Sequence, residues 1–271
     1  MKTIWNKIPA WGKSIIFLII LAIPIINIIQ GTAAYNLQNN PSWGWGILVA
    51  IPLLFIFWKL VSRWSPFNKP EDVKISMRMD VKHIKVWSRM LGLILLTLSA
   101  SVLFSEVFGV NQDYAEQYFE VFKQFGDATA LPLLIAIALT AGIVEEVVFR
   151  GYIQNTLVRA YPKVISFLAI ALVFALIHFL PWPLVIAFLI ISTCFSLVAD
   201  EFKSLGVVIL AHVLIDIISL LGLYYGSTNE TGPVGITIAG VVFIVSLILI
   251  LKDNKSIQLK RFTKSQLSQI N

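Results

Sequence analysis

The chain places two adjacent carboxylates and an arginine inside an apolar stretch. Glu145, Glu146 and Arg150 lie in a largely apolar run that begins near Ala130. A carboxylate at the centre of a membrane helix costs about 2.5–3.5 kcal/mol, so a pair of them indicates a functional site. At about 100° per residue, Glu146 and Arg150 lie one turn apart on one helical face and are expected to form an ion pair. Glu145 points about a quarter-turn away and is therefore the carboxylate available for chemistry.

Two histidines and an aspartate lie in later apolar stretches. His178 follows Phe174 by four residues and Asp216 follows His212 by four, so each pair shares a helical face. A single intramembrane His is usually a hydrogen-bonding group between helices, worth about 0.6 kcal/mol. Two His together with a Glu pair and an Asp favour a functional site instead. We expect Asp216 either to hold the His212 ring in one tautomer or to share a ligand with it.

The composition identifies the environment of these side chains. Of the 271 residues, 58% are hydrophobic and only 13% are charged, whereas soluble proteins average about 25% charged. The mean hydropathy is +0.83, which predicts a polytopic integral membrane protein. The net charge of +6 is accompanied by no nucleic-acid-binding motif, so no nucleic-acid partner is expected. Cys194, the only cysteine, lies in an apolar run and predicts neither a disulfide nor a cysteine metal cluster.

Eight apolar segments are long enough to cross a bilayer. They cover residues 14–30, 45–62, 87–109, 130–150, 164–180, 183–199, 204–225 and 234–251. With the amino terminus in the cytosol, every Lys and Arg except Lys123 falls in a cytosolic segment, as the positive-inside rule requires. The sequence therefore predicts an all-α protein with about eight transmembrane helices and both termini cytosolic. Nothing divides the chain, so residues 1–271 are predicted to form a single membrane domain.

Three motifs on three of these predicted helices carry a family resemblance. They are Glu145-Glu146-x-x-x-Arg150, Phe174-x-x-x-His178 and His212-x-x-x-Asp216. In this order and at these spacings they resemble the motifs of the CAAX-protease and bacteriocin-processing (CPBP, or Abi) intramembrane endopeptidases, which include the type II CAAX prenyl proteases. The resemblance covers about residues 130–220, which we take as the catalytic core.

The resemblance implies a role for each motif residue. Glu145 and His178 would activate a water for attack on a peptide carbonyl, while His212 and Asp216 would stabilise the oxyanion or complete the site. The supporting residues would be Glu146, Arg150 and Phe174. The family accepts Asn or Asp at the last position, and an ionised Asp only accepts hydrogen bonds, whereas an oxyanion needs donors. Asp216 must then be protonated, or must act by orienting His212.

Two mechanisms fit the same residues. In a glutamic-protease mechanism, Glu145 is the general base and His178 helps to place the water. In a metalloprotease mechanism, Glu145, His178 and His212 bind Zn²⁺, which acidifies the water. The sequence lacks the HExxH motif of many zinc proteases, so the metal-free mechanism is favoured and no cofactor is expected.

The function implied by the resemblance is an intramembrane endopeptidase in a bacterial cytoplasmic membrane. Its partners would be the lipid bilayer and a membrane-associated peptide or protein substrate, in bacteriocin maturation, self-immunity or peptide-signal processing. One alternative is a proton- or ion-coupled transporter, because chains of intramembrane Glu, His and Asp also relay protons. Such a transporter would predict inverted repeats, and none is evident. The other alternative is a non-catalytic immunity or scaffold protein with the same fold.

Overall fold

The protein is helical throughout the part of the chain that the structure describes. The computed structural model describes residues 7–63, 83–110, 120, 122–225 and 232–254, and these residues include no strand. The first helices are α2 (Ala10–Phe17), the π-helical η1 (Leu18–Ala22), α3 (Ile23–Asn39), α4 (Ile47–Arg63) and α6 (Ile84–Val107). Next come α8 (Asp127–Thr140), the π-helical η2 (Ala141–Glu145) and η3 (Val147–Ile153), and α9 (Gln154–Ala160). The last are α10 (Lys163–Leu176), α11 (Trp182–Phe202), α12 (Gly206–Tyr225) and α13 (Pro233–Leu251). The all-α prediction is confirmed.

An apolar helix lies at each predicted span. Six are long and apolar enough to cross a membrane: Ala10–Asn39, Ile84–Val107, Asp127–Ala160, Trp182–Phe202, Gly206–Tyr225 and Pro233–Leu251. The other two, α4 and α10, are shorter, and the 14 residues of α10 span only about 21 Å. The chain is thus an integral membrane protein, while the count of eight spans stays a prediction. The cytosolic location of both termini also stays a prediction, and residues 1–6 and 255–271 lie outside the described part.

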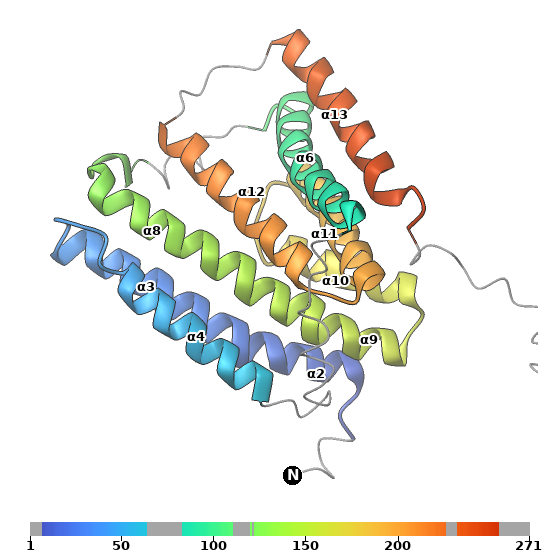
Figure 1. Cartoon of the computed structure of the whole chain (residues 1–271), viewed down its shortest axis with the longest axis horizontal. Coiled ribbons are helices and arrows are strands. Elements are labelled where there is room, and N and C mark those ends of the chain that lie inside the picture. Colours follow the sequence, from blue (N-terminus) through green and yellow to red (C-terminus); the bar gives the residue numbers. More distant parts are fainter. Residues whose placement is uncertain (1–6, 64–82, 111–119, 121, 226–231, 255–271) are drawn as a thin grey trace, which may run out of the picture.

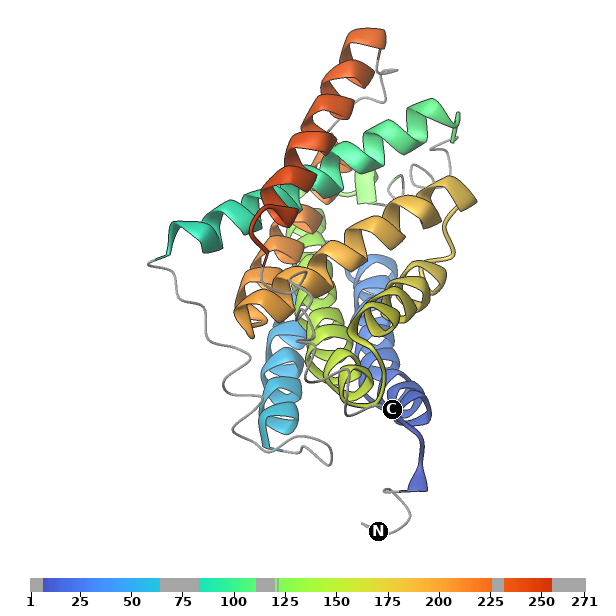
Figure 2. The ribbon, with the colours of Figure 1, turned by 90° about the vertical axis from the view of Figure 1, so that its right-hand side faces the viewer.

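The helices form one bundle in which α8 and α6 each lie between other helices. In Figure 1, α3 and α4 lie along α8, α12 lies on the other side of α8, and α6 separates α12 from α13. The α10–α11 pair closes the bundle, with α11 packed on both α6 and α12. Figure 2 shows that α6 and α11 run obliquely to α3 and α4. Apolar side chains that are almost fully buried fill the centre, among them Leu93, Val148, Ile170, Val198 and Val208.

The helix that carries the carboxylate pair departs from regular α geometry. The sequence analysis assumed 100° per residue here, but η2 and η3 have the wider turn of a π-helix, a feature frequent at functional sites. In η2, a side chain at Gly142 would place its Cβ 2.5 Å from Cγ2 and 2.8 Å from the backbone nitrogen of Val213. Only glycine fits this contact, and it brings η2 against α12 beside His212.

Candidate active site

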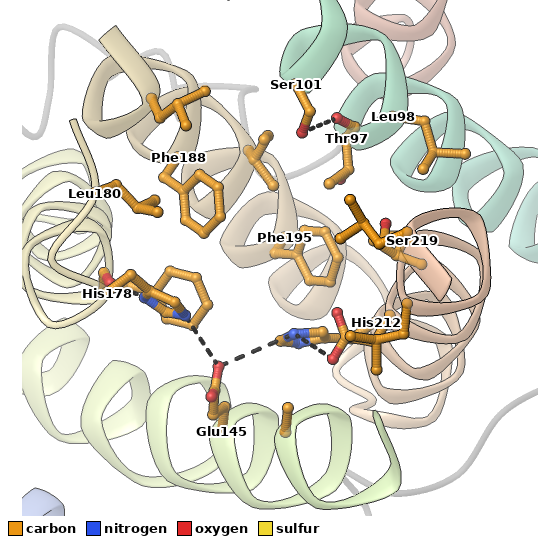
Figure 3. A pocket seen from close by; sticks show the side chains of 18 of the residues that line it. Thr97, Leu98, Ser101, Glu145, His178, Leu180, Phe188, Phe195, His212 and Ser219 are labelled. Atoms are coloured by element: carbon orange, nitrogen blue, oxygen red, sulfur yellow. Dashed lines mark hydrogen bonds and ion pairs between the residues drawn. The ribbon is translucent and has the colours of Figure 1, made fainter. Parts of the chain in front are cut away.

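One cavity contains every residue that the sequence analysis assigned to the site. It has a volume of about 620 Å³ and lies between α6, η2, α10, α11 and α12 (Figure 3). The predicted site residues in its lining are Glu145, Glu146, Arg150, Phe174, His178, His212 and Asp216. Motifs on three separate helical segments therefore line a single cavity.

Glu145 lies between the two histidines. Its Oε2 is 3.8 Å from Nε2 of His178 and 4.0 Å from Nε2 of His212 (Figure 3). This oxygen is buried and has no hydrogen-bond partner among the described residues. Of the two adjacent carboxylates in the lining, only Glu145 has a partly exposed side chain, at 13% against 0% for Glu146.

The His178 ring is held by the helix that precedes it. Nδ1 of His178 lies 2.6 Å from the carbonyl oxygen of Phe174, one of the last carbonyls of α10, which lack helical partners. A carbonyl only accepts hydrogen bonds, so Nδ1 must carry the proton and donate it. In the neutral ring Nε2 is then an acceptor, and it points at Glu145. The Phe174 and His178 rings lie 4.6 Å apart, which confirms the shared face predicted from their spacing.

The His212 ring is held by a different carboxylate from the one expected. Nδ1 of His212 donates to Oε1 of Glu146 at 2.8 Å, while Oδ2 of Asp216 lies 3.6 Å from Nε2. Glu146, rather than Asp216, therefore fixes the tautomer. The wide turn of η2 and the contact at Gly142 bring Glu146 to the ring, whereas Asp216 lies on the side of Nε2. That Asp216 shares a ligand with His212 stays a prediction.

Glu146 and Arg150 form the predicted ion pair, and both side chains are completely buried. Nη1 of Arg150 lies 2.9 Å from Oε1 of Glu146. Nη2 donates to the Ser192 hydroxyl at 2.8 Å and to the Ser192 carbonyl at 3.3 Å, which ties the pair to α11. The guanidinium also lies 4.7 Å from the ring centroid of Phe174 and 5.3 Å from that of Phe195. Oε1 of Glu146 thus accepts from both Arg150 and His212, and the pair positions the histidine.

The sequence analysis missed the contributions of α6 and α11. Ser192 binds Arg150, the Phe195 ring lies 5.8 Å from that of His212, and the Phe188 ring lies 5.1 Å from that of His178. Across the cavity, Thr97 and Ser101 of α6 line the wall (Figure 3). Their four-residue spacing within the predicted span 87–109 could have indicated that the two hydroxyls share one helical face. Nothing in the sequence indicated that α6 would face the three motifs.

The metal alternative can be tested against the donor positions. Zinc bonds of about 2.0–2.1 Å in a tetrahedral site place neighbouring ligand atoms about 3.3–3.4 Å apart. The corresponding separations from Glu145 to His178 and to His212 are 3.8 and 4.0 Å. Within the described residues no group of three or more His, Cys, Asp or Glu is arranged to hold a metal ion. As they stand, these donor atoms lie about 0.4–0.7 Å farther apart than tetrahedral zinc bonds would place them.

A comparison with known families agrees with this geometry. Residues 127–218 match the family model described as type II CAAX prenyl endopeptidase Rce1-like. No curated protein and no solved structure matches the chain. The family match confirms the resemblance carried by the three motifs: over these residues the chain is similar to the CAAX-protease family. It supports, in general terms, an intramembrane protease of the CAAX type.

Proposed function

We propose that this protein is a metal-free intramembrane endopeptidase in which Glu145 and His178 activate a water molecule. The observation that carries the proposal is the convergence of Glu145 Oε2 with two histidine Nε2 atoms in one cavity. Separations of 3.8 and 4.0 Å are too long for direct hydrogen bonds and suit a water that contacts all three groups.

The tautomers support this assignment. Both Nε2 of His178 and an ionised Glu145 accept hydrogen bonds, so the two hydrogens of one water can be directed to them. The oxygen of that water then has a lone pair directed at the substrate carbonyl carbon. As the C–O bond forms, Glu145 takes the proton as general base. His178 positions the water and is itself held by the Phe174 carbonyl.

His212 is placed to stabilise the tetrahedral intermediate. A ring that donates Nδ1–H to Glu146 and carries a second proton on Nε2 presents an N–H to the oxyanion. Because Glu146 already pairs with Arg150, the positive charge of this ring is balanced by the ionised Glu145 before attack and by the oxyanion after it. Asp216, beside the same Nε2, supplies a donor in its protonated form. When the intermediate collapses, the C–N bond breaks and Glu145 returns its proton to the leaving amine. One water and one peptide bond have then given a carboxyl group and an amine, and Glu145 is ionised again.

The substrate is proposed to be a membrane-associated peptide or protein, cleaved in a bacterial cytoplasmic membrane. Such a reaction would serve bacteriocin maturation, self-immunity or peptide-signal processing.

The test is a comparison of membrane peptides in cells with the wild type and cells with Glu145→Gln. New peptide termini that appear only with the wild type are the expected result. Identical peptide sets, with both proteins folded and present in the membrane, would contradict an endopeptidase and favour a transporter or a non-catalytic scaffold.

A second measurement tests the absence of metal from the mechanism. We expect the purified protein to cleave the peptide identified above without stoichiometric zinc and to keep its activity after treatment with a strong chelator. Loss of cleavage on chelation and recovery with Zn²⁺ would establish the metalloprotease alternative.

A further inference from the structure

The bundle has two unlike ends, and one of them is basic. At this end Lys85 and Arg89 of α6 pair with Glu201 of α11 at 2.6 and 2.9 Å, and Lys163 of α10 pairs with Asp200 at 2.8 Å. We call it the basic end. The other Lys and Arg residues at this end include Lys13, Lys59, Arg159, Lys203 and Lys252. By the positive-inside rule the basic end faces the cytosol.

A buried polar layer separates the cavity from the basic end. The side of this layer nearest the cavity consists of the Glu146–Arg150 pair and Ser192. One turn nearer the basic end, Gln154 donates to the Ser196 carbonyl at 3.1 Å. All these side chains are buried. This layer closes the site towards the cytosolic side.

The cavity instead extends towards the opposite end. Its lining includes Val110, which follows α6, Leu180 in the turn between α10 and α11, Leu184 in the first turn of α11, and Leu223 near the end of α12. These positions are the helix ends farthest from the basic end. The opening is therefore on the side that the charge distribution places outside the cell.

Three exposed aromatic residues, Phe108, Phe179 and Trp182, lie at this end. Phe179 is 93% exposed and Trp182 is 64% exposed, and the Trp182 ring lies 5.1 Å from that of Phe108. Aromatic side chains of this kind favour the boundary between headgroups and hydrocarbon. They place the opening of the cavity near the outer membrane–water boundary.

The lining also indicates what kind of peptide fits. Most of it is apolar, including Leu98, Phe188 and Phe195 (Figure 3). The hydroxyls of Thr97 and Ser101 donate to carbonyls of their own helix at 2.9 and 3.0 Å, so their lone pairs stay available to the cavity. Hydroxyl acceptors in an apolar cavity suit the N–H groups of an extended peptide with apolar side chains.

From these features we propose that the substrate reaches Glu145 from the end opposite the basic end, as an extended apolar peptide segment in the outer half of the membrane. The N–H groups of this segment bind the hydroxyl face of α6, and its scissile carbonyl reaches Glu145 and His212. This inference rests on the proposed endopeptidase function for the identity of the ligand, but the direction of access does not require catalysis.

The experiment measures access to introduced cysteines in intact cells. The background is Cys194→Ala, because the native thiol is buried. Ser219→Cys and Leu223→Cys place thiols in the cavity, and Lys252→Cys places one at the basic end. We expect a membrane-impermeant thiol reagent to label the two cavity variants in intact cells and to label Lys252→Cys only after permeabilisation. If Lys252→Cys reacts in intact cells and the cavity variants react only after permeabilisation, or if the cavity variants never react, the proposal is overturned.

A second arm tests the occupant in detergent. An uncharged, leucine-rich decapeptide should slow the labelling of Ser219→Cys at least threefold, and an acidic decapeptide of equal length should not. Adding Thr97→Val and Ser101→Ala should remove most of that protection. Equal protection by both peptides, or none, would contradict the apolar-segment assignment. Because labelling needs no turnover, an inactive protein can still support or contradict this inference.

Discussion

Two neighbouring carboxylates, Glu145 and Glu146, belong to two very different regions of the protein. Glu145 lies in the open region, where its side chain is 13% exposed and that of His178 is 27% exposed to the cavity. Glu146 lies in the closed region, where its side chain and that of Arg150 are 0% exposed. Oε2 of each carboxylate lacks a hydrogen-bond partner among the described residues, but only Glu146 is also held in a buried ion pair, through its Oε1. Environment, rather than residue type, separates the proposed general base from the proposed supporting group.

His212 connects the two regions. Its Nδ1 is bound to Glu146 in the closed region, and its Nε2 faces Glu145 and Asp216 in the open one. The orientation of this ring therefore couples the closed region to the open one. Substitutions of Glu145 should therefore lower activity without lowering stability, whereas substitutions of Glu146 should lower both.

The largest effect is expected for Glu145→Gln. This change keeps the shape of the side chain but removes the general base, so kcat/KM for the cleaved peptide should fall at least ~10²-fold. Because Glu145 Oε2 has no hydrogen-bond partner among the described residues, the unfolding temperature in detergent should not change. Cleavage at the wild-type rate would end the assignment of Glu145 as the base.

Glu146→Gln should instead act through stability. It leaves the buried Arg150 without its charge partner, and breaking a buried pair typically costs about 3–5 kcal/mol. We expect a lower yield of folded protein, a lower unfolding temperature and reduced cleavage, measured beside Glu145→Gln as the matched control. A folded, stable and inactive Glu146→Gln, together with an active Glu145→Gln, would reverse the two roles.

Gly142→Ala tests the helix contact that brings the regions together. The added methyl would meet Val213 at 2.5 Å, and overpacking of this kind costs about 1–3 kcal/mol. The shift should also move Glu146 away from His212 and lower kcat by about tenfold. Gly240→Ala on α13, where a Cβ meets nothing within 4 Å, is the control and should retain full activity and stability. Equal behaviour of the two variants would show that the close approach is not required.

The smallest effect is expected for Ser192→Ala. It removes the hydroxyl that accepts from Arg150 at 2.8 Å but leaves the Ser192 carbonyl in place. A hydrogen bond to a charged group contributes about 1.5–3 kcal/mol, and the remaining contact should reduce the loss to about 1 kcal/mol. Thermal unfolding should detect this change while KM stays at the wild-type value. A large change in KM would mean that Ser192 also contacts the substrate.

Local spacing made much of this site predictable from sequence. The apolar segments place a helix at each of the eight predicted spans, and the four-residue spacing of Glu146 and Arg150 predicts their ion pair. The same spacing predicts the shared face of Phe174 and His178. These features depend only on neighbours within one helical turn, so the sequence by itself determined them.

Tertiary packing decided the rest. The choice of Glu146 rather than Asp216 as the partner of His212 depends on π-helical turns and on the contact between Gly142 and Val213. The hydroxyls of α6 and the aromatic rings of α11 reach the site because helices that are distant in sequence pack together. The spacing of residues along the chain does not predict that packing. The distance of Glu145 from each histidine is likewise set by three helices at once. Sequence alone therefore identified the candidate groups, and only the folded bundle determined how they are arranged around the cavity.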